Sequence, residues 1–238
     1  MSSTQYTLAG IAVSNGESFV LEIDVLEIAG GKLHLLMGPN GSGKSTLLRI
    51  LAFLDRPAQG EMTFSGAPVA WNARNLAALR RKVTLLHQHP YLFSGSVLAN
   101  VAFGARMRGI SKEARRELAS SLLRRVGLEG FEKRNARHLS GGEASRVSLA
   151  RALACKPEVL LLNEPLAQAD KQSVAALTSL IAALPAEGLT VVMSSHDDLL
   201  AERLGDSVIH LCEGRVSAVD RHPRFIHNDQ ENRCDGLP

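Results

Sequence analysis

Residues 38–46 read Gly-Pro-Asn-Gly-Ser-Gly-Lys-Ser-Thr and contain the complete phosphate-loop pattern G-x-x-x-x-G-K-[ST]. Glycines in such a loop let backbone N–H groups converge on one anion, because no side chain blocks the approach of phosphate. The Lys reaches the β- and γ-phosphates of a nucleotide, and the Ser hydroxyl ligates Mg²⁺. The sequence therefore predicts a nucleotide site at Gly38, Pro39, Asn40, Gly41, Ser42, Gly43, Lys44, Ser45 and Thr46.

The flanks of this loop agree with the pattern. Residues 33–37 form a short apolar run, which predicts a strand, and the apolar residues after Lys44 recur at helical spacing. The helix that begins near Lys44 would add its positive N-terminal end to the phosphate site. A Gly/Ser turn without a ligand is the alternative, and it does not account for this strand and helix.

A second group with possible chemistry is Leu139-Ser140-Gly141-Gly142-Glu143. It directly precedes a helical pattern that we expect over residues 144–153, so a hydroxyl and backbone N–H groups are displayed at a helix N-terminus. By itself this could be a simple turn. In a chain that already has a phosphate loop, Ser140, Gly141 and Gly142 indicate a second anion site.

A third group is the apolar run 159–162 followed by Asn163 and Glu164. The run is typical of a buried parallel strand, whose carboxyl end lies at the edge where α/β proteins bind ligands. Glu164 is therefore a candidate general base for a water that attacks the γ-phosphate.

Gln88 and His196 complete the candidate site, because each follows a predicted strand and could reach the same sheet edge. Gln88 offers a carbonyl oxygen to Mg²⁺ or to a water. His196 offers an N–H donor to the γ-phosphate. We expect Glu164, His196, Gln88 and Lys44 to be the catalytic residues, and Ser45, Gln88 and Asn163 to face the metal.

Strands and helices alternate along the chain, which predicts an α/β fold with a mainly parallel sheet. Two strands around Asn15-Gly16 predict an antiparallel N-terminal part, and strands at 207–212 and 215–219 are expected at a sheet edge. A helical block at about 90–157 interrupts the alternation, and its best helix begins at Ser111 and ends at Gly127. We therefore expect one domain over 1–220 with a helical subdomain inserted, and a polar tail over 221–238.

Composition and charge limit the possible classes of protein. The 238 residues are 45% hydrophobic and 21% charged, as in an ordinary globular chain. Residues 101–151 contain twelve Lys and Arg against five Glu, so a basic surface for nucleic acid or an anionic membrane is possible, although a solvated helical face is the simpler interpretation. We expect neither a signal peptide nor a membrane-spanning segment, since the first residues are polar and no apolar run is long enough.

In their order along the chain, these motifs resemble the nucleotide-binding subunits of ATP-binding cassette (ABC) transporters over about residues 8–219. The resemblance implies a P-loop NTPase core, with ATP and Mg²⁺ as cofactors. It also implies a head-to-tail homodimer or paired cassette, in which Ser140 and Gly142 of one chain close over ATP held on Lys44 of the other. An integral membrane permease would dock on residues 91–103, at the cytoplasmic face of the membrane.

The short chain resembles importer subunits in particular, which work with a solute-binding protein, and residues 90–104 resemble those of importers for oxyanions such as tungstate.

The sequence departs from the family pattern in three places. Asn163 stands where the family has Asp, which removes a negative charge from the Mg²⁺ site and predicts weaker metal binding or slower turnover. Asn15 stands where an aromatic residue often stacks on adenine, with Phe19 as a possible substitute. Residues 166–169 differ from the family's usual segment before Asp170, which bears on communication across the dimer.

Two other functions compete with that of an importer ATPase. Asn163 favours a hydrolytically weak, nucleotide-binding regulatory cassette. The basic middle segment favours a chromosome-maintenance ATPase, but the long heptad insertions of those proteins are absent, so no nucleic acid partner is expected.

Overall fold

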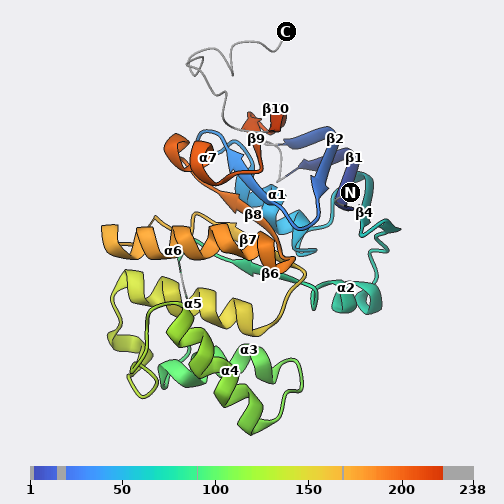
Figure 1. Cartoon of the computed structure of the whole chain (residues 1–238). Coiled ribbons are helices and arrows are strands. Elements are labelled where there is room, and N and C mark those ends of the chain that lie inside the picture. Colours follow the sequence, from blue (N-terminus) through green and yellow to red (C-terminus); the bar gives the residue numbers. More distant parts are fainter. Residues whose placement is uncertain (1–2, 15–19, 90, 168, 222–238) are drawn as a thin grey trace.

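The computed structural model describes residues 3–14, 20–89, 91–167 and 169–221 (Figure 1). Its described strands form one ten-stranded sheet in the order β5-β4-β1-β2-β10-β9-β3-β8-β7-β6. The parallel part contains β3 (Leu33–Met37), β8 (Thr190–Ser194), β7 (Val159–Asn163) and β6 (Val83–Leu86). The antiparallel part contains β1 (Thr4–Ser14), β2 (Val20–Ala29), β4 (Gln59–Phe64) and β5 (Ala67–Pro68). An α/β fold with antiparallel N-terminal strands is therefore confirmed.

The last two strands differ from the expectation that they form an edge. β9 (Ser207–Cys212) pairs in parallel with β3, and β10 (Arg215–Arg221) pairs with both β9 and β2. They lie in the middle of the sheet and connect its parallel part to its antiparallel part. The prediction was wrong because a hairpin near the end of a chain carries no local signal of the strands that flank it.

Apolar residues on both faces of the parallel strands explain the continuous hydrophobic runs. Successive strand residues point to opposite faces, so Leu161 of β7 packs in one core cluster, whereas Leu160 and Leu162 pack in another. The first cluster contains the inner face of α1 (Lys44–Leu51), and the second contains α6 (Lys171–Ala183) and α7 (Asp198–Leu204).

Helices α3 (Val97–Arg106), α4 (Lys112–Arg125) and α5 (Gly141–Ala154) lie together, away from the antiparallel strands (Figure 1). They share a third apolar cluster, which includes Val101, Leu123 and Val147. Ser111 caps α4 as expected, since its side chain accepts from the backbone N–H of Ala114, and Gly127 adopts a positive φ of 69° just beyond the helix.

The remaining described helices are short: α2 (Ala73–Leu79) and two 3₁₀ segments at Ala136–His138 and Leu184–Glu187. The expected turn at Asn15-Gly16 and the tail after Arg221 lie outside the described residues.

Helix α5 begins three residues before the expected Ala144, at Gly141. Ser140 and Glu143 form a complete capping box, in which each side chain accepts from the other residue's backbone N–H. This cap satisfies two N–H groups of the first turn, so the helix includes both glycines despite their low helix propensity.

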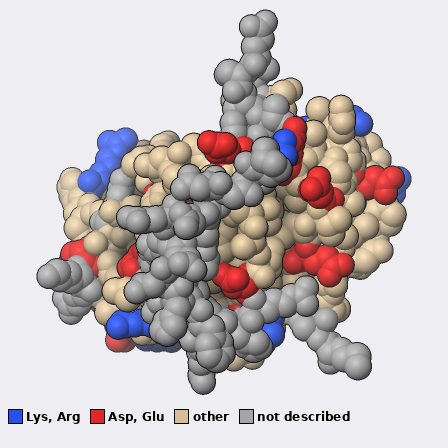
Figure 2. Space-filling view, turned by 90° about the horizontal axis from the view of Figure 1, so that it is seen from above, with Lys and Arg blue, Asp and Glu red and all other residues tan. Residues whose placement is uncertain are grey.

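Charge is unevenly distributed over the surface. The end of the molecule that carries β10 shows Asp and Glu side chains together with scattered Lys and Arg where it is visible (Figure 2), whereas the Lys- and Arg-rich residues 101–151 include α4 and parts of α3 and α5 at the opposite end (Figure 1). No helix in the described ranges is long and apolar enough to cross a membrane.

Close packing of α3 on α5 at Gly104 predicts an unusual stability effect. A Cβ added to Gly104 would lie 2.4 Å from the carbonyl oxygen of Arg151, so the two helices would have to separate. We expect Gly104→Ala to lower the free energy of unfolding by about 1–3 kcal/mol, because the overpacking exceeds the gain in helix propensity. Urea unfolding of the variant and the wild type measures this change in the free energy of unfolding. The control Ala99→Gly, on the exposed face of the same helix, should cost about 1 kcal/mol; a stabilised Gly104→Ala variant would contradict the close packing.

Candidate active site

The phosphate loop connects β3 to α1, as its pattern predicts, and close backbone packing fixes its start. Gly38 has a φ of 144°, and a Cβ on it would lie 2.0 Å from the carbonyl oxygen of Leu211 in β9. Any side chain would therefore push the loop away from the sheet. Gly43, with a φ of 99°, is the N-cap of α1 and supplies no side-chain cap, so the first N–H groups of the helix face the loop without a side-chain partner.

Lys44 is a buried cation, only 5% exposed. Its Nζ donates to the carbonyl oxygens of Gly38 (2.7 Å) and Pro39 (2.9 Å), and in the described part of the chain no carboxylate forms an ion pair with it. Burial lowers the pKa of Lys44, and the nearby Glu164 carboxylate opposes this shift. The ammonium group is therefore a largely buried positive charge held by two carbonyl oxygens, and an anionic phosphate is a ligand it can bind.

Parallel pairing of three strands places the other candidate residues beside the loop. β8 lies between β3 and β7, and in this register Ser194 is opposite Leu36 on one side and Asn163 on the other. The carboxyl ends of these strands therefore meet at one edge, next to the loop that follows β3.

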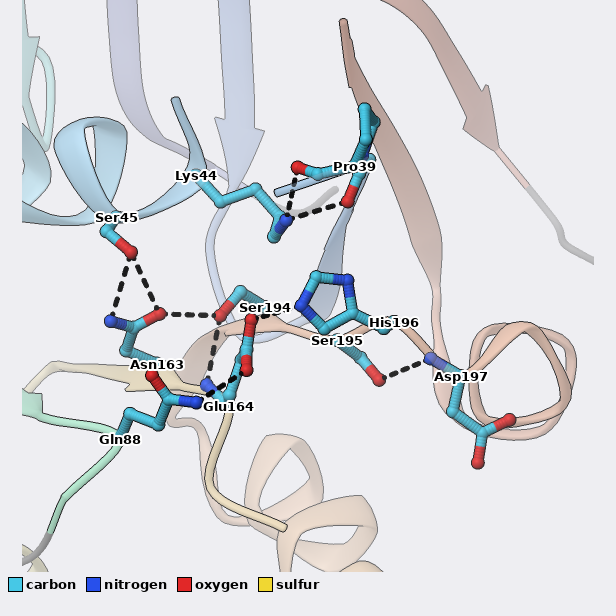
Figure 3. A network of polar contacts seen from close by, with 11 residues as sticks. Pro39, Lys44, Ser45, Gln88, Asn163, Glu164, Ser194, Ser195, His196 and Asp197 are labelled. Atoms are coloured by element: carbon cyan, nitrogen blue, oxygen red, sulfur yellow. Dashed lines mark hydrogen bonds and ion pairs between the residues drawn. The ribbon is translucent and has the colours of Figure 1, made fainter. Parts of the chain in front are cut away.

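Asn163, at the end of β7, lies in a network of short polar contacts (Figure 3). Its Oδ1 accepts from the Ser194 hydroxyl (2.9 Å), and its Nδ2 lies 3.1 Å from the Ser45 Oγ. The Ser194 Oγ in turn accepts from the backbone N–H of Glu164 (3.0 Å). Asn163 and Ser45, both expected to face the metal, lie in contact with each other, and the fully buried Ser194 was not anticipated.

The Glu164 carboxylate is contacted from two sides. Gln88 donates through Nε2 to one oxygen at 2.9 Å, and the Nε2 of His196 contacts the other oxygen (Figure 3). Glu164 has a positive φ of 46°, which is uncommon for a non-glycine residue. Residues that follow two other strands, β6 and β8, thus converge on the carboxylate that follows β7.

These residues line a polar hollow of about 520 Å³. It brings together most of the residues expected from the sequence: Asn40, Gly41, Ser42, Gly43, Lys44, Ser45, Thr46, Gln88, Glu164 and His196. The volume is sufficient for the phosphate groups of a nucleotide. Helix N-terminal N–H groups, a buried Lys and a carboxylate in one hollow can bind a phosphate chain and activate a water beside it.

Ser140, Gly141 and Gly142 do not line this hollow. Ser140 and Gly141 are exposed at the start of α5, whereas Gly142 is buried against α6, where a Cβ would lie 2.7 Å from Oδ2 of Asp170. Asp170 caps α6 by accepting from the backbone N–H of Ser173 at 2.9 Å. A single chain therefore does not bring its two predicted anion sites into one hollow.

Asn15 and Phe19, which were considered for contact with adenine, lie outside the described residues. Ser194 was missed because a small Ser at the end of an apolar run does not interrupt the strand pattern, yet a polar residue at a strand's carboxyl end is the same signal that identified Asn163.

Comparison with known proteins agrees with this geometry. Residues 21–167 match the ABC transporter family. Together with the relatives described next, this match defines the class: the chain belongs to the ATP-binding subunits of ABC transporters, a family of ATPases.

Two curated relatives illustrate the range of the family. The tungstate uptake system ATP-binding protein TupC of Peptoclostridium acidaminophilum is 34% identical over 91% of this chain and 98% of its own length. The spermidine/putrescine import ATP-binding protein PotA of Mesoplasma florum is 38% identical over 87% of this chain and 58% of its own length.

Solved structures share the fold. The chain is similar to cbiO1 of Clostridium perfringens, part of the ABC transporter complex cbiONQ, with a TM-score of 0.85, 28% identity, and coverage of 93% of this chain and 89% of the other. It is also similar to the ATP-binding cassette MJ0796, a dimer in a post-hydrolysis state with ADP and Pi, with a TM-score of 0.82, 30% identity, and coverage of 91% and 98%.

The buried charge of Lys44 predicts opposite effects on stability and on binding. Lys44→Met keeps the side-chain volume but removes a desolvated cation, so the nucleotide-free protein should gain about 1 kcal/mol of stability. The variant should lose the rise in melting temperature that ATP produces. Thermal unfolding with and without ATP measures both effects.

The control is Lys32→Met, which removes the same charge from an exposed Lys paired with Asp206. It should retain the ATP effect. Full ATP-dependent stabilisation of Lys44→Met would contradict a phosphate-binding role for this residue.

Proposed function

We propose that this chain is the ATP-hydrolysing subunit of an importer, a cassette over residues 1–220 with its helical subdomain at about 90–157. The observation that carries the proposal is the convergence of Gln88, Glu164 and His196 on the hollow formed by the phosphate loop. ATP would lie with its phosphates on the N–H groups of residues 38–46 and on Lys44.

Mg²⁺ fits this site as an ion bound chiefly through ATP. In the described part of the chain no cluster of three His, Cys, Asp or Glu residues could hold a metal by itself. The oxygens available are the Ser45 hydroxyl, the Asn163 amide and the Gln88 amide, all of them neutral. Nucleotide phosphates supply the negative charge that Mg²⁺ requires, so Ser45 would be its main protein ligand, and the ion would offset charge on the phosphates.

Glu164 is the proposed general base, and His196 and Lys44 the groups that stabilise charge on the γ-phosphate. The contacts of Gln88 and His196 with the Glu164 carboxylate support this assignment, because they orient it within the hollow. A carboxylate so placed can take a proton from a water as it attacks phosphorus.

A head-to-tail dimer would complete the site. Ser140 and Gly141 are exposed and lie outside the hollow of their own chain, so the Ser140 hydroxyl proton and the Gly141 N–H can face ATP bound on another chain. The dimeric state of the similar cassette MJ0796 supports this arrangement.

An exposed aromatic cluster supports a membrane permease as partner. Tyr91 is 73% exposed, and its ring lies 5.7 Å from that of Phe93, which lies 4.8 Å from that of Phe103. Apolar surface of this kind at one end of a molecule is typical of a protein interface. We infer that the chain docks there at the cytoplasmic face of the membrane.

The tungstate system of TupC favours an oxyanion as solute, delivered by a solute-binding protein.

A hydrolytically weak regulatory cassette is the second candidate, and the contact between Asn163 and Ser45 favours it. The amide gives the metal site no negative charge, so binding of ATP would be retained while turnover is slow. ATP hydrolysis assayed with and without the permease distinguishes the two functions, because an importer subunit is stimulated by its partner.

Replacing the proposed base should separate binding from hydrolysis. Glu164→Gln keeps the size and hydrogen-bonding capacity of the side chain, but it cannot take a proton from water, so we expect hydrolysis to fall by about 10²–10⁴-fold with ATP affinity retained. Phosphate release and ATP titration measure the two quantities. Glu158→Gln, at the other end of β7, should keep wild-type turnover; comparable turnover of both variants would refute Glu164 as base.

The dimer can be tested with a substitution that preserves the helix cap. Ser140→Asp retains an N-cap acceptor, so the fold should persist, but its negative charge would repel ATP phosphates held on a partner chain. We expect hydrolysis and ATP-driven dimerisation to be lost, with ATP binding to the monomer unchanged; light scattering and ATP titration measure these properties.

The same change at Ser111, the N-cap of α4, is the matched control and should leave dimerisation intact. Dimerisation and turnover that survive Ser140→Asp would argue against a composite site.

A further inference from the structure

The start of α5, proposed above to face ATP on a partner chain, has carboxylates beside it. Oε2 of Glu143 accepts from the backbone N–H of Ser140 at 2.8 Å. A Cβ on Gly142 would lie 2.7 Å from Oδ2 of Asp170, so a second carboxylate lies against the same turn. Negative charge this close opposes an anionic phosphate, whereas the helix N-terminus attracts it. A positive charge that balances these carboxylates would therefore favour ATP at this turn.

Arg134 places a guanidinium group next to one of these carboxylates. Its Nη1 lies 3.8 Å from Oε1 of Glu143, while the other oxygen of that carboxylate binds the N–H of Ser140. One carboxylate thus connects Arg134 to the residue proposed to contact ATP. No step assigned above to ATP binding or hydrolysis uses Arg134 or the charge of Glu143.

The guanidinium group of Arg134 is held in place by an aromatic ring. Its central carbon lies 3.6 Å from the centre of the Phe131 ring, a cation–π contact. The backbone is fixed as well, since the N–H of Arg134 donates to the carbonyl of Phe131 and its carbonyl accepts from the N–H of Val97, both at 2.9 Å. A side chain that is already restrained loses less conformational entropy when it meets a ligand.

Arg134 is also open to a partner chain. Its side chain is 57% exposed, whereas that of Glu143 is 21% exposed. In water an exposed ion pair of this kind contributes little to stability. A second chain that closed over the turn would exclude water, which strengthens both the attraction of ATP to Arg134 and its repulsion by Glu143. The balance between the two charges would therefore matter in the dimer more than in the monomer.

We propose that Arg134 enables the start of α5 to receive ATP held on a partner chain, by balancing the charge of Glu143 beside Ser140. The inference rests on the proposed head-to-tail dimer and adds a residue to its composite site. Arg134 has an electrostatic function that acts when two chains close on ATP. It determines how tightly the ATP-bound chains associate, and it leaves the affinity of a single chain for ATP unchanged.

The test is the dissociation constant of the ATP-bound dimer, measured by analytical ultracentrifugation of the full chain with saturating ATP and Mg²⁺. Every protein compared carries Glu164→Gln, so that hydrolysis does not dissolve the dimer during the measurement. The Glu164→Gln protein without further changes is the reference. Equilibrium dialysis at protein concentrations too low for dimerisation measures the affinity of the single chain for ATP.

Arg134→Gln should weaken the ATP-bound dimer about tenfold, which is about threefold for each of its two composite sites. Glu143→Gln retains the helix cap, because an amide oxygen can accept from the Ser140 N–H, and it should tighten the dimer. The double variant should return to the reference value. Arg134→Lys keeps the charge and should stay within about twofold of the reference. The control Arg116→Gln, at an exposed position of α4, should leave the dimer unchanged.

A purely structural role for Arg134 predicts a different pattern, in which Arg134→Gln and the double variant are equally weakened and Glu143→Gln has no effect. That pattern, an Arg134→Gln dimer as tight as the reference, or an equal loss in Arg116→Gln would overturn the inference. ATP-driven dimerisation of the reference would still uphold the proposed composite site.

If Arg134→Gln does not fold, as judged by circular dichroism, two other variants decide. A tenfold weaker dimer of Arg134→Lys, or a Glu143→Gln dimer no tighter than the reference, overturns the inference. A reference protein that binds ATP without dimerising would overturn the proposed dimer itself, and this inference with it.

Discussion

Parallel pairing of β3, β8 and β7 is the constraint on which the rest of the site depends. The register that sets Leu36, Ser194 and Asn163 side by side fixes where each strand ends. The phosphate loop, the Glu164 turn and the loop of His196 must all begin at that edge. Their relative positions follow from hydrogen bonds among buried strands, which are the most rigid part of an α/β domain.

Local signals made much of this site predictable. The phosphate loop, the ends of β3 and β7 and the cap at Ser111 are encoded within a few residues of each feature, so the sequence alone located them. The place of β9 and β10 was not predictable, because it depends on pairing with β3 and β2, which are far away along the chain. The contacts of Ser194 were hidden for the same reason, since its partners lie on another strand.

Neutral groups near the phosphate loop change the electrostatic balance of the site. Lys44 contributes a buried positive charge, and Glu164 is the only acidic residue that lines the hollow among the described residues. With Asn at position 163, the site offers a stronger net attraction to the anionic nucleotide than a second carboxylate would allow. An amide oxygen carries no negative charge, so it attracts a divalent cation less than a carboxylate oxygen does.

Helix α5 connects the exposed Ser140 to the aromatic cluster that contains Tyr91 and Phe93. Its N-cap is Ser140, and its last turn carries Arg151, which donates to the carbonyl of Tyr91 at 2.7 Å and lies 5.1 Å from the Phe93 ring centre. A helix of 14 residues is a hydrogen-bonded rod about 21 Å long, stiff on this scale. A tilt of the helix at its Ser140 end would therefore also move its Arg151 end, and with it the aromatic cluster that Arg151 contacts.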